Sequence, residues 1–150
     1  MTEPARASRL RAAAHVAAYA GGCLLVGSML LDWPWIGRRG QLHGLTMLAR
    51  VRRVSTALGV PHAWLLSVAW FAMPVCGAVV MMATAHHSRR TRRVAVGTAA
   101  FALVETLLMM RAYYGVRLDP WAGSGLAVAM AGAALATAGS AWTWATSRRP

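Results

Sequence analysis

The sequence predicts an all-α integral membrane protein: one four-helix bundle over residues 1–150, with an outer interfacial amphipathic helix between the first and second spans. Three observations predict this class. The chain is 57% hydrophobic and only 13% charged, whereas soluble domains carry about 25% charged residues. Four apolar stretches each reach the roughly 20 residues that a helix needs to cross a bilayer core. The arginines lie in short clusters between those stretches, and too little polar sequence remains to cover a soluble core.

The four expected spans follow the apolar runs in chain order. Their boundaries lie at about Ala12 to Leu31, Val60 to Ala85, Val94 to Tyr114 and Trp121 to Ala145. The first run follows basic residues, as a secretory signal does. It is longer than a typical signal and lacks a small-x-small cleavage site, so we expect an uncleaved first span.

The net charge of +12 comes from 16 basic and 4 acidic residues, and it raises the alternative of nucleic-acid binding. A nucleic-acid site needs a continuous basic face with exposed aromatic residues. Here apolar runs separate the basic clusters, and the aromatic residues lie at the ends of those runs. We therefore expect no nucleic-acid partner.

The positions of the arginines predict an orientation in the cytoplasmic membrane. With the N-terminus in the cytoplasm, nine arginines lie inside and seven outside, in keeping with the positive-inside rule. The compact basic loop at residues 86–93 carries the strongest local signal, and Asp32 and Asp119 fall on the opposite side. We expect both termini to be cytoplasmic.

The long first outer connection contains an amphipathic segment at about residues 44–59. Its apolar arc holds Met47, Leu48, Val51, Val54 and Leu58. Its basic arc holds Arg50, Arg52 and Arg53. This pattern is typical of a helix that lies on the bilayer with its arginines toward anionic headgroups. A soluble cap packed on the span ends is the alternative.

A similar signature follows the first and third spans: Leu31-Asp32-Trp33-Pro34-Trp35 and Leu118-Asp119-Pro120-Trp121. Proline delimits a helix, aspartate caps a following turn, and tryptophan anchors at the headgroup level. We therefore expect both signatures at the outer membrane surface, and their matching positions suggest two hairpins of related architecture.

The chain also resembles a group of small four-span membrane proteins of actinobacteria that has no established activity. The resemblance rests on Pro34-Trp35, then Gly37 and Arg39, a Trp-containing second span with a central Pro74, and a Gly/Ala-rich fourth span. The chain departs from the group at Gln41-Leu42-His43-Gly44, where a Ser-Gly pair is expected. The resemblance implies topology and localisation, and it carries over no catalytic residue.

One face of the fourth span consists wholly of small residues. They are Gly125, Ala129, Gly132, Ala136 and Gly139. Such a stripe permits close approach of helix backbones in lipid. The partner is either the first span, which has small residues of its own at positions 14, 18 and 21–23, or the same face of a second copy in a homo-oligomer. In the second span, Pro74 should bend the helix.

Glu105 lies near the middle of the third span, where an acidic residue costs roughly 2.5 to 3.5 kcal/mol of insertion free energy. We expect it to face the bundle interior, where Ser28 and Ser67 approach it, with His62, Asp32 and Arg111 lining the same outward-facing cleft. Two interpretations are open. Glu105 binds a proton, a cation or a polar headgroup, or it is a neutral carboxyl that hydrogen-bonds another helix and fixes the bundle.

The sequence contains no phosphate-binding loop, nucleophile elbow or metal-ligand spacing. We therefore expect no enzyme activity, no metal and no cofactor. The leading functional prediction is an accessory, scaffold or assembly subunit of envelope machinery, with anionic lipids and a membrane-protein partner. The alternative is a small transporter or proton-coupled module that uses Glu105.

Overall fold

The computed structural model describes residues 3–34, 41–44, 46, 53, 63–86, 88–115 and 124–147. The described elements are α1 (Glu3–Gly27), the short 3-10 helix η1 (Ser28–Leu30), β1 (Asp32–Pro34), β2 (Gln41–His43), α3 (Ala63–Ala85), α4 (Arg89–Gly115) and α5 (Ser124–Thr146). The expected helical class is confirmed, with one addition that the sequence did not predict. Asp32–Pro34 pairs antiparallel with Gln41–His43 in a small two-stranded sheet.

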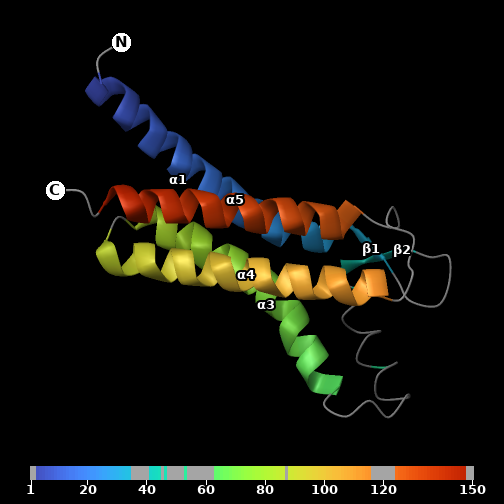
Figure 1. The fold of residues 1–150 in the computed structure, drawn as a ribbon. Coiled ribbons are helices and arrows are strands. Elements are labelled where there is room, and N and C mark those ends of the chain that lie inside the picture. The colour runs from blue at the N-terminus through green and yellow to red at the C-terminus, as the bar shows by residue number, and fades with distance from the viewer. Residues whose placement is uncertain are drawn as a thin grey trace.

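The four long helices of the described chain form a closed ring. Helix α1 packs on α3 and α5, and α4 packs on the same two helices. In Figure 1, α1 and α4 run in one direction and α3 and α5 in the other, so the start of α1, the end of α5 and the turn between α3 and α4 share one end of the bundle. The β1–β2 sheet lies at the other end.

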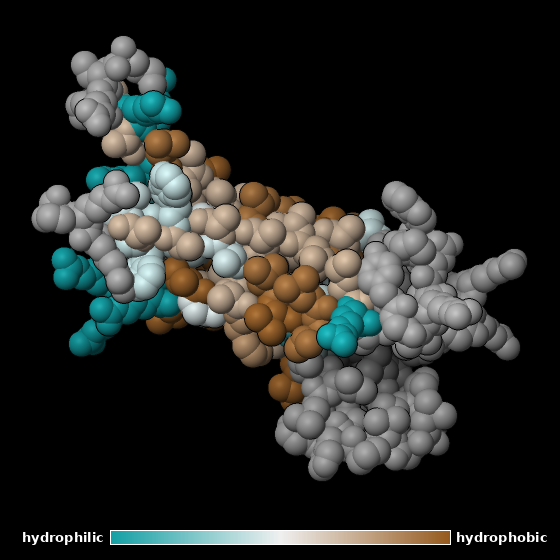
Figure 2. Space-filling view, viewed as in Figure 1, coloured by the Kyte–Doolittle hydropathy of each residue, from teal (hydrophilic) through white to brown (hydrophobic). Residues whose placement is uncertain are grey.

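Three of the described helical segments are long and apolar enough to cross a membrane: Ala5–Leu30, Arg89–Arg111 and Ser124–Thr146. In α3, the apolar stretch so identified is shorter and covers Trp70–Ala85. Figure 2 shows hydrophobic colours along the middle of the molecule and hydrophilic colours where α1 and α4 begin. This distribution fits a membrane protein.

Helix α1 begins earlier than expected, at Glu3, because the alanines and arginines before residue 12 are good helix formers. It ends where Ser28 Oγ donates a hydrogen bond to the carbonyl oxygen of Leu25, at 2.7 Å. Pro34 then favours extended backbone in the residue before it, which suits a strand rather than another helical turn. The chain therefore leaves the helix and enters β1.

Close backbone contact joins α1 to α5. A methyl group added at Gly132 would lie 2.9 Å from the carbonyl oxygen of Gly21, and one added at Gly139 would lie 2.5 Å from the carbonyl oxygen of Ala14. The small-residue stripe of α5 is buried, and Gly132 and Gly139 lie directly against α1. The intramolecular partner is therefore α1, and glycine is needed because any side chain would meet backbone.

The adjacent residue Gly22 makes the equivalent approach to α3. A methyl group at Gly22 would lie 2.8 Å from the carbonyl oxygen of Gly77, and one at Gly77 would lie 2.7 Å from the carbonyl oxygen of Gly22. Successive residues of a helix point about 100° apart. The Gly21-Gly22 pair therefore lets one turn of α1 contact α5 and α3 at the same time.

Two sequence expectations need correction at the sheet end. Trp33 was expected to be a headgroup anchor, but its side chain is fully buried. Gly125, expected to contact a helix as part of the stripe, instead faces the indole ring of Trp33. The reason is that α1 ends near this level, so the space beside α5 is filled by the strand that follows.

Pro74 lies inside α3, as expected, and is half-buried. Figure 1 shows that the N-terminal half of α3 turns away from the bundle, while the C-terminal half follows α4. A proline in a helix removes one backbone hydrogen bond and commonly bends it.

The α1–α5 contact predicts that alanine substitution changes stability differently at Gly132 of α5 and at Gly97 of α4. Alanine at either position should gain up to about 1 kcal/mol of helix propensity. Gly132→Ala should also lose about 1–3 kcal/mol through overpacking. At Gly97 on α4, an added methyl group meets nothing within 4 Å. Thermal unfolding of the purified protein in detergent should therefore show Gly132→Ala melting below Gly97→Ala, and equal melting temperatures would contradict the packing described here.

Candidate functional site

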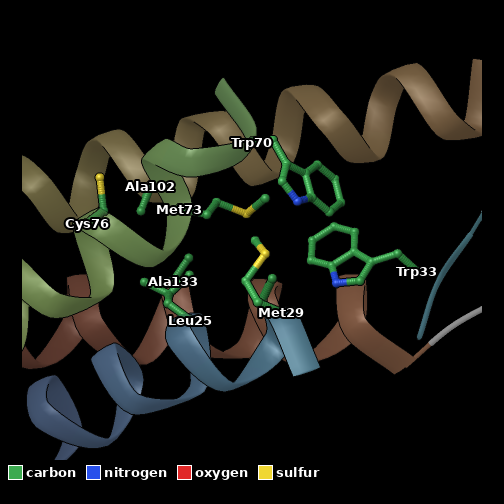
Figure 3. Packing of buried hydrophobic residues seen from close by; sticks show 9 residues of the cluster. Leu25, Met29, Trp33, Trp70, Met73, Cys76, Ala102 and Ala133 are labelled. Atoms are coloured by element: carbon green, nitrogen blue, oxygen red, sulfur yellow. The ribbon is translucent and has the colours of Figure 1, made fainter. Parts of the chain in front are cut away.

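Two tryptophans close the interior of the bundle at the sheet end. Trp33 of β1 and Trp70 of α3 meet edge to face, with ring centroids 4.5 Å apart and an interplanar angle of 67°. Each indole N–H donates to a backbone carbonyl: Trp33 to Ser28 at 2.8 Å and Trp70 to Gly44 at 3.0 Å. Figure 3 shows the two rings facing each other beside Met29 and Met73. Because both polar N–H groups are satisfied, the pair can be buried without an unpaired donor.

Gly44 is fixed by the chain on either side of it. Its backbone N–H donates to the carbonyl oxygen of Leu31 at 3.1 Å, and a methyl group added to it would lie 2.7 Å from the carbonyl oxygen of Met29. Gly44 is the first residue of the expected interfacial helix, and it is buried against the end of α1. The rest of that expected helix falls almost wholly outside the described residues, including Arg50 and Arg52, while Arg53 is exposed.

An apolar pocket of about 330 Å³ lies beside the tryptophan pair. Its lining comes from the end of α1, from η1, from Gly44 and from the N-terminal half of α3 as far as Pro74. The lining residues are Val26, Met29, Leu30, Gly44, Trp70, Phe71 and Pro74. An apolar pocket of this kind suits a hydrocarbon group, and its described lining residues offer no group for acid, base or nucleophilic chemistry.

Glu105 of α4 lies inside the bundle, as expected, with 8% of its surface exposed. Neither of its carboxylate oxygens has a hydrogen-bond partner among the described residues. Cys76 of α3 lies within electrostatic range of the carboxyl. A buried acid with unpaired oxygens is costly, and in a membrane-spanning helix such a residue is by default a candidate site for a proton or cation.

The neighbouring Thr106 does not relieve Glu105. Its hydroxyl donates to carbonyl oxygens of its own helix, at 2.9 Å from Ala102 and 3.0 Å from Leu103. Thus the hydrogen bond to another helix, on which the structural interpretation of Glu105 depends, is absent from the described residues.

Among the described residues, no hydrogen bond joins the Glu105 carboxyl to Ser28, Asp32 or Arg111, so the expected cleft stays a prediction. The Ser28 hydroxyl is buried and committed to Leu25, and Asp32 lies in β1. Arg111 is exposed, and it projects from α4 about 120° around the helix from Glu105. His62 and the side chain of Ser67 lie outside the described residues.

The two cysteines are free thiols rather than a disulfide. Cys76 is buried, whereas Cys23 is exposed on α1, 3.9 Å from the sulfur of Met81. Within the described ranges, no group of three His, Cys, Asp or Glu side chains could hold a metal ion.

Sequence reasoning missed the tryptophan pair and its link to Gly44. The sequence places Trp33 next to a proline after the first span and Trp70 one helical turn before Pro74. Those positions indicate proximity to one membrane surface, but they do not fix the rotation of α3 or the return of the chain at Gly44.

Comparisons with protein-family models, with curated proteins and with solved structures give no match to the chain.

Proposed function

We propose that the chain is a four-span protein of the cytoplasmic membrane with both termini in the cytoplasm. Helix α3 has 23 residues, or roughly 35 Å at 1.5 Å per residue, which supports it as the fourth span. The turn between α3 and α4 is followed by Arg89, Arg90, Arg92 and Arg93. The start of α1 and the end of α5 lie at the same end of the bundle. A concentration of arginines favours the cytoplasmic side.

Within that membrane, we propose that the protein is an accessory, scaffold or assembly subunit of envelope machinery. The observation that carries this proposal is the outward face of α5, where exposed alanines recur at helical spacing. They are Ala127, Ala131, Ala134 and Ala138. Leu135 and Trp142 are exposed on α5 as well, whereas more of the exposed residues of α4 are large, such as Phe101, Val104 and Leu108. Small residues permit close approach of another membrane helix, so α5 offers a docking face for a partner protein or a second copy.

The arginines at positions 50, 52 and 53 extend this proposal to lipid. On an interfacial helix they would contact anionic headgroups at the outer surface. The hydrogen bonds of Gly44 with Trp70 and Leu31 support this, because they hold the start of that segment at the sheet end of the bundle.

The docking proposal predicts where a partner can be crosslinked. A photo-reactive phenylalanine analogue replacing Ala131 should form a protein adduct of discrete mass in membranes of cells that produce the protein. The same analogue replacing Val104, which is 56% exposed on α4, should face lipid and form none. An adduct of twice the chain mass would identify a homo-oligomer. Equal adducts at both positions, or none at Ala131, would contradict the proposal.

A second candidate function is a small transporter or proton-coupled module centred on Glu105. It is favoured by the unpaired, buried carboxyl within a helix that is long enough to cross a membrane. In this function the carboxyl carries a proton or binds a cation between the helices.

Glu105→Gln tests the second candidate, because glutamine keeps the size and polarity of the side chain and removes its titration. If Glu105 carries protons, proteoliposomes containing the wild-type protein should show proton flux that the variant lacks, while the melting temperatures of the two proteins remain similar. Equal flux in the two proteins would exclude a proton-carrying role for this residue.

A further inference from the structure

A second, polar pocket opens at the opposite end of the bundle from the tryptophan pair. Its volume is about 70 Å³, roughly that of two water molecules. Residues from three helices and the turn after α5 line it: Arg11 and His15 from α1, Arg92 from α4, Thr143 and Thr146 from α5, and Ser147 just beyond α5. Neither of the proposed functions uses this pocket.

Among the described residues, the lining carries positive charge without a matching negative charge. Arginine side chains stay protonated in proteins, so Arg11 and Arg92 bring two positive charges to one small space, while the six lining residues include no carboxylate. Two like charges repel each other unless an anion lies between them.

Arg92 also holds a donor that no described residue satisfies. Its Nε atom is shielded from solvent and has no hydrogen-bond partner among the described residues. A buried donor without an acceptor costs free energy, and such a group calls for an explanation. An acceptor oxygen that reached this nitrogen, after a shift of the Arg92 side chain that uncovers it, would remove the cost.

The hydroxyl groups in the lining are already committed to α5. Thr143 donates to the carbonyl oxygen of Ser140 at 2.9 Å, Thr146 to that of Trp142 at 3.0 Å, and Ser147 to that of Trp144 at 2.7 Å. Of the arginines and hydroxyls in the lining, the guanidinium groups are therefore the donors that a ligand can meet, and the ligand must supply acceptors.

We propose that this pocket binds a phosphate group, held by Arg92 and Arg11. The planar guanidinium matches the oxygens of phosphate in a bidentate geometry and forms strong charge-assisted hydrogen bonds. The volume suits one such group, and the pocket is open, so the rest of a larger ligand can lie outside it. The phosphate belongs either to a lipid headgroup or to inorganic phosphate.

The position of the pocket makes either source accessible. It lies at the end of the bundle where Arg89, Arg90 and Arg93 are exposed, and Figure 2 shows hydrophilic colours there, beyond the apolar middle. In a bilayer this end lies at the level of the headgroups.

Calorimetric titration of the full chain in dodecyl maltoside tests the proposal with two probes, dioctanoyl phosphatidic acid and inorganic phosphate. At least one probe should bind, and Arg92→Gln should weaken its binding about tenfold or more, as expected for loss of a charge-assisted hydrogen bond. Arg90→Gln is the matched control. It removes the same charge from the same helix, at an exposed residue outside the pocket, and should change the affinity less than twofold.

Binding of the lipid alone would identify a headgroup as the source, and binding of both probes would show that free phosphate suffices. Dioctanoyl glycerol, which lacks the phosphate, should not bind. If Arg92→Gln does not fold, Arg11→Gln replaces it and should also weaken binding. The proposal is overturned if the wild-type protein binds neither probe, or if the pocket variant and the Arg90→Gln control lose the same affinity.

Discussion

Backbone contact between α1 and its two neighbours is the constraint on which the rest of the structure depends. In lipid there is little hydrophobic drive between helices, so dispersion contacts and weak hydrogen bonds must hold them together. At Gly21 with Gly132, and at Gly22 with Gly77, each glycine directs an α-hydrogen toward the carbonyl oxygen of the other. Such Cα–H···O contacts recur at helix–helix interfaces. Two glycines in succession let α1 make both contacts.

The position of α1 also determines which side chains meet at each end of the bundle. At one end, η1 and β1 place Trp33 over the interior of the bundle, where it contacts Trp70 and Gly125. At the other end, Arg11 of α1 comes to share a pocket with Arg92 of α4. Between them, the apolar core surrounds Glu105 without giving it a hydrogen-bond partner in the described chain. In the proposed function, the exposed alanines of α5 contact a partner helix, and the other exposed apolar side chains contact lipid.

Much of the helical frame could be predicted from the sequence, because span length and apolar composition are one-dimensional properties. The small residues of α5 could be identified in the same way, since their spacing follows the helical period. The surroundings of single side chains could not be predicted, because they depend on how each helix is rotated and where each loop returns. Trp33 has the composition of a headgroup anchor but is buried by the strand that follows α1. Arg92 sits in a basic run typical of a loop, and only the packing of three helices shows that it differs from Arg90.

The most direct test of the central claim is a measurement of proton distances between α1 and α5. Helix axes in ordinary packing lie about 8–10 Å apart, a separation at which backbone protons of two helices rarely come close. In detergent micelles, NMR spectra of the deuterated protein with protonated glycine should show cross-relaxation between the α-protons of Gly21 and the amide proton of Ala136, whose nitrogen faces Gly21. The same spectra should connect Gly139 with the amide of Ala18. Strong cross-peaks within each helix without either of these peaks between helices would contradict the account.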